Sequence, residues 1–384
     1  MPPPQIWASQ PFKAAYIAYF LLLKAPIQLT FIALLYLIKG CPLPPRSYGQ
    51  NIAATLTRMV FDLCAKARLP KLAYDDPFAA GDRCVVVQPA NGRLYHGALS
   101  SSPVVKPEAK PAVWFPGPPP TTPEDTALLK TKERVVLQFV GGAFVMGLGY
   151  KHYGDDVFKL YSQHLKADRV IWADYRICDG SAEMKFPAPI QDAVTHYAHL
   201  ISLGIDPKNI VIAGDSAGGN MVLALLRHLE FLHETQPESA LPFPAGAIVF
   251  SPWVTVTPTV GQDFFKYENS RYDTVSSALG QWGADAYRPE GKLSDEIEGF
   301  VSPFGHPFKT SVPLFIHDGD AEVLHENIKV FASDMMEKNS EKIVRYHSTP
   351  VGPHDLLLGH PVYKMTGQLG MAIDEAFEFF EASK

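Results

Sequence analysis

The segment GDSAGG at residues 214–219 carries the strongest chemical signal in the chain. The pattern G-x-S-x-G, preceded by an apolar strand and followed by an amphipathic helix, is typical of a nucleophile elbow. Small residues at Gly214 and Gly218 permit a tight turn that exposes the Ser216 hydroxyl, and the dipole of the following helix favours a developing anion. We therefore expect Ser216 to attack a carbonyl carbon, with the amide of Ala217 donating to the resulting oxyanion.

A nucleophilic serine needs a histidine that accepts its proton. The segment TPVGPHDLLL places His354 in a turn after the last predicted strand, where such a base is expected. His347 lies inside that strand and His360 stands directly before a proline, so neither fits the position as well. We predict that His354 is the base.

The base in turn needs a carboxylate that orients it. Three carboxylates follow the strand predicted at residues 313–317, in the segment DGDAEVLHEN. Glu322 is the favoured acid, and Asp320 and Asp318 stay open as alternatives. Further amides for the oxyanion are expected from a glycine-rich loop after an early strand, and FVGGAF at residues 139–144 lies in that place.

Strands and helices alternate from residue 134 onwards, which is the arrangement that must hold these residues. Apolar strands are predicted at 134–140, 169–175, 209–215, 246–252, 313–319 and 342–348, and helices at 155–165, 189–204 and 218–233. Continuous apolar strands that alternate with helices predict an α/β fold with a parallel sheet covered on both faces. Residues 253–299 break the alternation and are predicted to form an inserted cap.

The segment before residue 134 is less regular. Residues 42–73 have a helical pattern with one apolar face. Two apolar runs at 84–90 and 93–99 flank Asn91-Gly92 and predict a hairpin. Eight prolines between residues 103 and 123 predict an extended surface loop.

The N-terminal part is the most apolar stretch of the chain. Residues 14–38 are long enough for a spanning helix, but Lys24, Pro26 and Gln28 lie at the middle. Three interpretations follow: a signal anchor, two helices that lie on a membrane, or a helical lid over the protein's own site. Membrane association is favoured, with the endoplasmic reticulum as the candidate compartment.

The composition describes a globular chain: 384 residues, 47% apolar, 19% charged and a net charge of −6. A mildly acidic chain without a long basic run is a poor nucleic-acid binder. Its four cysteines lie far apart and predict neither a zinc site nor a dense disulfide framework. The sequence does not indicate an oligomeric state.

These motifs together resemble the hormone-sensitive-lipase-like branch of the α/β-hydrolase fold, which includes arylacetamide deacetylases and steryl-acetate hydrolases. The resemblance rests on VGGA, DYRICDGSAEMKFPAPIQDA, GDSAGG, EVL, SPW and VSPF in order, and covers residues 134–384. It implies the triad Ser216, Glu322 and His354, and oxyanion donors at Gly142, Ala143 and Ala217. The apolar N-terminus followed by PLPPRSYG resembles fungal membrane-associated members of this group.

Two departures from the family pattern stand out. Val140 replaces the histidine that usually opens the oxyanion loop, and Cys178-Asp179 replaces an Ala-Pro pair. The oxyanion donors are backbone amides, so the first departure does not exclude hydrolysis.

The sequence thus predicts an apolar N-terminal helical segment at 1–73 and an α/β-hydrolase catalytic domain at 74–384. The expected activity is serine-dependent hydrolysis of a lipophilic ester with a short acyl group, in a pocket walled by Phe144, Trp253 and Trp282. No metal or organic cofactor is expected. The alternatives are acyl transfer or cyclisation at the same site, and a non-catalytic receptor, which is disfavoured because no triad member is missing.

Overall fold

A computed structural model describes residues 6–383 of the chain and contains one eight-stranded sheet. The strand order is β1-β2-β4-β3-β5-β6-β7-β8, antiparallel for β1–β2 and β2–β4 and parallel for the rest. The strands are β1 Cys84–Val87, β2 Lys110–Phe115, β3 Val135–Phe139, β4 Arg169–Ala173, β5 Ile210–Asp215, β6 Gly246–Phe250, β7 Leu314–Gly319 and β8 Val344–Thr349. All residues of β3 and β5 are buried, as expected for strands covered on both faces.

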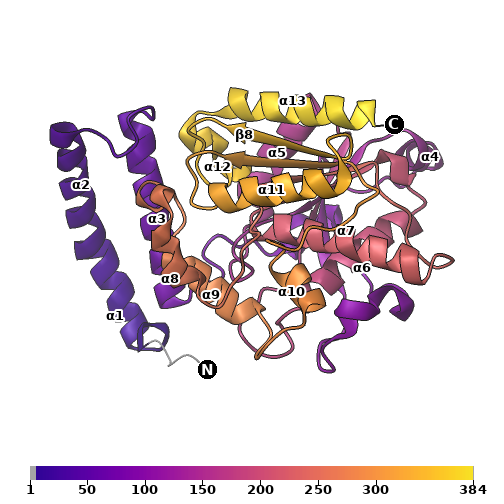
Figure 1. Cartoon of the computed structure of the whole chain (residues 1–384), viewed down its shortest axis with the longest axis horizontal. Coiled ribbons are helices and arrows are strands. Elements are labelled where there is room, and N and C mark those ends of the chain that lie inside the picture. The colour runs from indigo at the N-terminus through magenta and orange to yellow at the C-terminus, as the bar shows by residue number, and fades with distance from the viewer. Residues whose placement is uncertain (1–5, 384) are drawn as a thin grey trace.

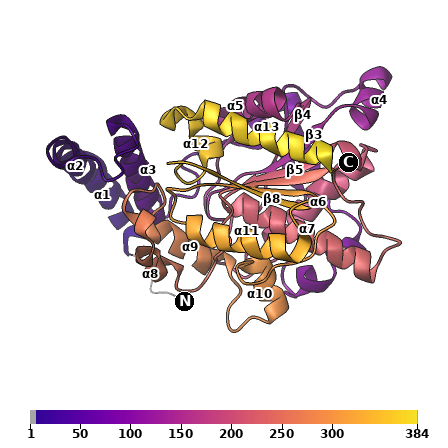
Figure 2. The ribbon, with the colours of Figure 1, turned by 45° about the horizontal axis from the view of Figure 1, so that its top comes forward.

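Helices cover both faces of this sheet (Figure 2). One face carries α5 (Tyr150–His164) and α13 (Thr366–Ala382), and the other carries α6 (Ala188–Ser202), α7 (Ala217–Thr235) and α11 (His325–Asn339). Two shorter helices, α4 (Pro123–Thr131) and α12 (Leu356–Tyr363), lie at the edges of this layered body. The predicted α/β-hydrolase arrangement is therefore present.

Helices also fill the interval between β6 and β7. They are α8 (Val260–Asp263), α9 (Ser277–Tyr287) and α10 (Asp295–Val301). The helix α3 (Tyr48–Ala67) from the N-terminal part packs against α9 and α12. The cap is therefore formed by two separate parts of the sequence, α3 and the interval between β6 and β7. The division at residue 73 into an N-terminal segment and a catalytic domain stays a prediction.

Two local predictions before residue 134 are wrong. The second arm of the expected hairpin forms short 3₁₀ turns at Gly92–Tyr95 and Gly97–Ser100 instead of a strand. The Tyr95 hydroxyl lies 2.7 Å from the Thr195 hydroxyl of α6, so tertiary packing outweighs the local hairpin preference. In the proline-rich stretch, β2 is a buried strand because its apolar side chains fill the core between β1 and β4.

The apolar N-terminal stretch forms one continuous helix, Phe12–Lys39, rather than two. It consists of α1 (Phe12–Tyr19), a π-helical turn at Phe20–Lys24 and α2 (Ala25–Lys39). The π turn precedes Pro26, whose missing N–H removes a helical hydrogen bond. Within the described residues this is the one helix long and apolar enough to cross a membrane. Residues 1–5 of the predicted N-terminal segment lie outside the described part.

Candidate active site

Ser216 sits at the turn between β5 and α7, and its backbone has the left-handed φ of +50°. The turn is tight on both sides: a Cβ at Gly214 would lie 2.4 Å from the carbonyl oxygen of Gly218. A Cβ at Gly218 would lie 2.0 Å from the carbonyl oxygen of Phe139. The glycines are therefore a steric requirement, and the geometry is that of a nucleophile elbow.

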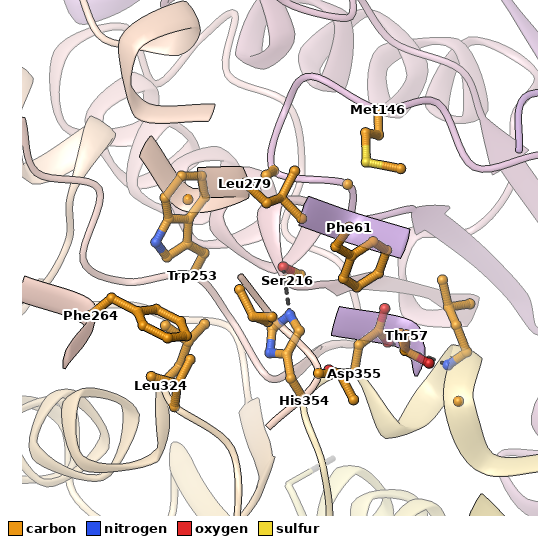
Figure 3. Close-up of a pocket in the computed structure, with 18 of the residues that line it drawn as sticks. Thr57, Phe61, Met146, Ser216, Trp253, Phe264, Leu279, Leu324, His354 and Asp355 are labelled. Carbon is orange, nitrogen blue, oxygen red and sulfur yellow. Dashed lines mark hydrogen bonds between the residues drawn. The ribbon is translucent and has the colours of Figure 1, made fainter. Parts of the chain in front are cut away.

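The structure brings Ser216, His354 and Glu322 into one chain of hydrogen bonds. His354 Nε2 lies 3.0 Å from Ser216 Oγ (Figure 3). His354 Nδ1 lies 2.9 Å from Glu322 Oε2. Glu322 is fully buried, whereas Ser216 and His354 retain a small exposed fraction. With Nδ1–H donating to the carboxylate, Nε2 is free to accept the serine proton.

Neither alternative acid contacts His354. Asp318 is buried but accepts hydrogen bonds from His325 Nδ1 and the Tyr346 hydroxyl. Asp320 is exposed and accepts from the amide of Val351. Glu322 is thus the carboxylate that orients the imidazole.

The buried Glu322–His354 pair titrates as a unit. Burial raises the pKa of Glu322 to about 8, and its hydrogen bond with His354 opposes that rise. Burial lowers the pKa of His354, but the hydrogen bond and charge of Glu322 outweigh burial and raise it to about 9. The neutral imidazole that a general base requires is therefore favoured on the alkaline side of the ordinary histidine pKa.

The loop after β3 supplies the expected amides. Gly142, Ala143 and Phe144 all have positive φ, at 111°, 53° and 63°. A Cβ at Gly142 would lie 2.2 Å from the carbonyl oxygen of Met146, so only glycine fits there. Within residues 6–383 the amides of Gly142, Ala143 and Ala217 donate to no other group, which leaves them available to an oxyanion.

Val140 stands where the family has histidine, and other residues orient the loop. The Tyr175 hydroxyl donates to the carbonyl oxygen of Val140 at 2.7 Å and lies 3.2 Å from that of Gly141. The Asp215 carboxylate accepts the amide of Gly141 at 2.7 Å. The loop is therefore held from both sides without the histidine.

Asp215 also meets a second carboxyl group. Its side chain lies beside that of Asp355, the residue after His354; Asp215 is fully buried and Asp355 is half-buried. Burial and the neighbouring Asp355 charge raise the pKa of Asp215 well above its usual range. This pair joins the nucleophile turn, the oxyanion loop and the histidine loop.

Sequence reasoning missed Asp273, a fully buried carboxylate before α9. It accepts the amide of His354 at 3.0 Å and the amide of Val323 at 2.8 Å, so it ties the acid loop to the histidine loop. Arg46 supports the same region by donating to the carbonyl oxygens of Val351 and Tyr272. No local motif marks Asp273, and the segment PLPPRSYG, which contains Arg46, does not indicate its partners, because the partners of both residues lie far away in the sequence.

A cavity of about 220 Å³ opens beside Ser216 and His354. Its apolar wall comes from the cap, the oxyanion loop and α3, and Phe61, Met146, Trp253, Phe264, Leu279 and Leu324 contribute to it (Figure 3). The predicted wall residue Trp253 lines this cavity, but Phe144 and Trp282 do not. Phe144 is fully buried and stacks on Tyr287 at 3.8 Å between ring centroids, and Trp282 packs under the Arg68 guanidinium on another side of the cap.

The part of the chain that the structure describes holds no group of three or more His, Cys, Asp or Glu residues arranged for a metal ion.

Comparison with known sequences shows the family of the chain. The sequence profile described as "alpha/beta hydrolase fold" matches residues 136–358, which is more than half of the chain. The chain belongs to the α/β-hydrolase family. The matched part contains Ser216, Glu322 and His354. The resemblance to the hormone-sensitive-lipase-like branch is confirmed, because relatives of this α/β hydrolase are named acetyl-hydrolase, arylacetamide deacetylase-like 2 and putative steryl acetyl hydrolase.

Two curated relatives and one solved structure illustrate the likeness. An esterase of Acinetobacter venetianus is 29% identical over 221 residues, which cover 56% of this chain and 64% of that protein. Human arylacetamide deacetylase-like 2 is 31% identical over 107 residues, 26% of each chain. A crystal structure of an esterase from the bacterial hormone-sensitive lipase family has a TM-score of 0.58 at 19% identity and covers 86% of this chain and 98% of its own.

The matches are partial in length. This α/β hydrolase spans between 51% and 64% of the length of the first curated relatives it matches. The solved structure shares the fold.

Proposed function

We propose that the protein is a serine carboxylic-ester hydrolase that works through an acyl-enzyme. One observation carries the proposal: the hydrogen-bonded chain from Ser216 through His354 to Glu322 ends at an apolar cavity. The relatives named esterase and acetyl-hydrolase support ester hydrolysis as the reaction class.

The proposed mechanism has two half-reactions. His354 Nε2 accepts the proton of Ser216 Oγ as that oxygen attacks the ester carbonyl, and the amides of Gly142, Ala143 and Ala217 stabilise the oxyanion. The protonated His354 then donates its proton to the leaving alcohol, which leaves an acyl group on Ser216. Water enters, gives its proton to His354 and attacks the acyl-enzyme, and the acid leaves as Ser216 recovers its proton.

A lipophilic ester with a short acyl group is the proposed substrate class. Most of the cavity wall is apolar, which favours an apolar alcohol or acyl part. The exposed apolar helix Phe12–Lys39 supports association with a membrane, with the endoplasmic reticulum as the candidate compartment. A water-soluble, charged ester is expected to be a poor substrate.

The test is hydrolysis of p-nitrophenyl esters of increasing acyl length by the parent protein and by Ser216→Ala. We expect turnover that is greatest for acetate or butyrate and that disappears in the variant, which leaves the fold intact because only one oxygen is removed. A fluorophosphonate probe should label the parent and not the variant. Equal turnover by Ser216→Ala would refute the proposal.

Acyl transfer or cyclisation at the same site predicts a different pattern. The probe would then label Ser216, but hydrolysis would be absent until a second alcohol was supplied. Product analysis with and without that alcohol separates the two reactions.

A further inference from the structure

The Phe12–Lys39 helix has two contrasting faces. Its long polar side chains point toward the protein: Lys13 donates to the carbonyl oxygen of Arg68 at 3.0 Å, and Lys24 lies 3.4 Å from Asp62 Oδ2. The Tyr36 hydroxyl lies 3.1 Å from that of Thr55. Within the helix the one exposed charged side chain is that of Lys39, at its C-terminal end.

The opposite face is apolar and exposed along the whole helix. Leu22 is 75% exposed and Ile38 is 80% exposed. The same face carries Phe12, Tyr19, Leu21, Leu23, Ile27, Phe31, Leu34 and Leu37. At 28 residues the helix is about 42 Å long, so this is one continuous apolar strip along the molecule.

The helix is docked on α3 through a small core of its own. Tyr16 and Phe20 pack with Met59, Leu63 and Ala67 of α3, and the cluster is separate from the main core. Figure 1 shows α3 between this helix and the rest of the molecule, and Figure 2 shows the same order. The helix therefore runs along the side of the body.

This docking is incompatible with crossing a bilayer. A spanning helix that stayed docked would carry α3 into the hydrocarbon, together with Arg58, Asp62 and Lys66. A spanning helix that left α3 would place Lys24 near the middle of the bilayer without Asp62. A helix on a lipid surface keeps every one of these contacts and buries the exposed strip.

We propose that Phe12–Lys39 lies flat on a phospholipid surface, with its outward strip among the acyl chains and its inward face docked on α3. Thr57 and Phe61 of α3 line the cavity beside Ser216, so a single helix separates the lipid-bound helix from the candidate active site. A route for the substrate from the lipid surface past α3 to the cavity rests on the proposed function. The lipid contact itself does not.

The first test is flotation of the full chain with phosphatidylcholine vesicles. We expect the parent protein to float without anionic lipid, because the outward strip has no basic side chain. Replacing Leu22, Phe31 and Ile38 together by Gln should lower the partition coefficient by about tenfold or more. The matched control replaces Leu128, Val330 and Met371, which are exposed apolar residues on α4, α11 and α13, by Gln and should float like the parent.

The second test separates a flat helix from a spanning one. Glycosylation sequons are placed in an extension ahead of Met1 and in the exposed turn at Gly291 (Glu290→Asn with Lys292→Thr), and the chain is translated with microsomes. A flat helix keeps both sites on one side, so both or neither are modified in the membrane-bound protein. Modification of a single site, or flotation unchanged in the triple Gln variant, would overturn the proposal. Neither flotation nor glycosylation depends on hydrolysis. Failure of the proposed lipid contact is therefore distinguishable from failure of the proposed function.

Discussion

Replacing Glu322 by Gln should move the pH dependence of the reaction as well as slow it. The substitution keeps the side-chain shape and removes the charge that lies 2.9 Å from His354 Nδ1. Burial lowers the pKa of His354, but Glu322, with smaller contributions from Asp273 and Asp355, raises it from its ordinary 6.5 to about 9. At about 1.36 kcal/mol per pKa unit, that rise corresponds to about 3 kcal/mol of stabilisation of the imidazolium.

The imidazolium forms in the transition state. Removing the charge that stabilises it therefore raises the activation barrier and lowers the rate. We expect kcat/KM at the alkaline plateau to fall by about 10²- to 10³-fold. Burial, which lowers the pKa of His354, remains in the variant and is opposed only by the charges of Asp273 and Asp355, so the pKa of His354 should drop toward its ordinary 6.5 or below it. The acid limb of the profile, where activity is lost as His354 gains a proton, should therefore move to lower pH.

The assay is kcat/KM for a soluble short-acyl ester measured from pH 5 to pH 10. Asp320→Asn is the matched control, because Asp320 lies on the same loop but contacts the amide of Val351 instead of His354. The control should keep the acid limb of the parent. An acid limb that stays in place in Glu322→Gln, or moves equally in Asp320→Asn, would refute our assignment of the acid.

Two further substitutions test the surroundings of the triad. Asp273→Asn should lower kcat by about tenfold with little change in KM, because Asp273 holds the amides of His354 and Val323 but does not line the cavity; an unchanged kcat would contradict a positioning role. Tyr287→Phe should raise the free energy of unfolding by about 1 kcal/mol in urea titration, because the hydroxyl of the fully buried Tyr287, which stacks on Phe144 and does not line the cavity, has no hydrogen-bond partner within residues 6–383; destabilisation would mean that the hydroxyl is hydrogen bonded.

The parts of the fold that could be predicted are those whose signal is local. The strand β5 is wholly apolar up to Asp215, and the glycines around Ser216 follow from steric limits on one turn. The place of His354 followed from the order of strands, because the carboxyl ends of parallel strands meet at one edge of the sheet.

The misses depended on distant partners. Asn91-Gly92 is a good hairpin turn, but Tyr95 is drawn to Thr195, a hundred residues later. Asp273 lies 81 residues before the His354 amide it accepts, in a cap with no repeating pattern. The prediction that Phe144 and Trp282 wall the pocket is wrong because packing decides side-chain direction: Phe144 stacks on Tyr287, and Trp282 packs against Arg68.

Arg46 limits how the protein can be shortened. Removing the apolar helix is an obvious route to a water-soluble form for crystallisation or screening. A cut after Arg46 would also remove the guanidinium that donates to Val351 and Tyr272, and with it a brace on the loop that carries His354. A cut between Lys39 and Arg46 spares that brace but uncovers Met59 and Leu63 on α3, so a useful soluble form also needs polar replacements at those two positions.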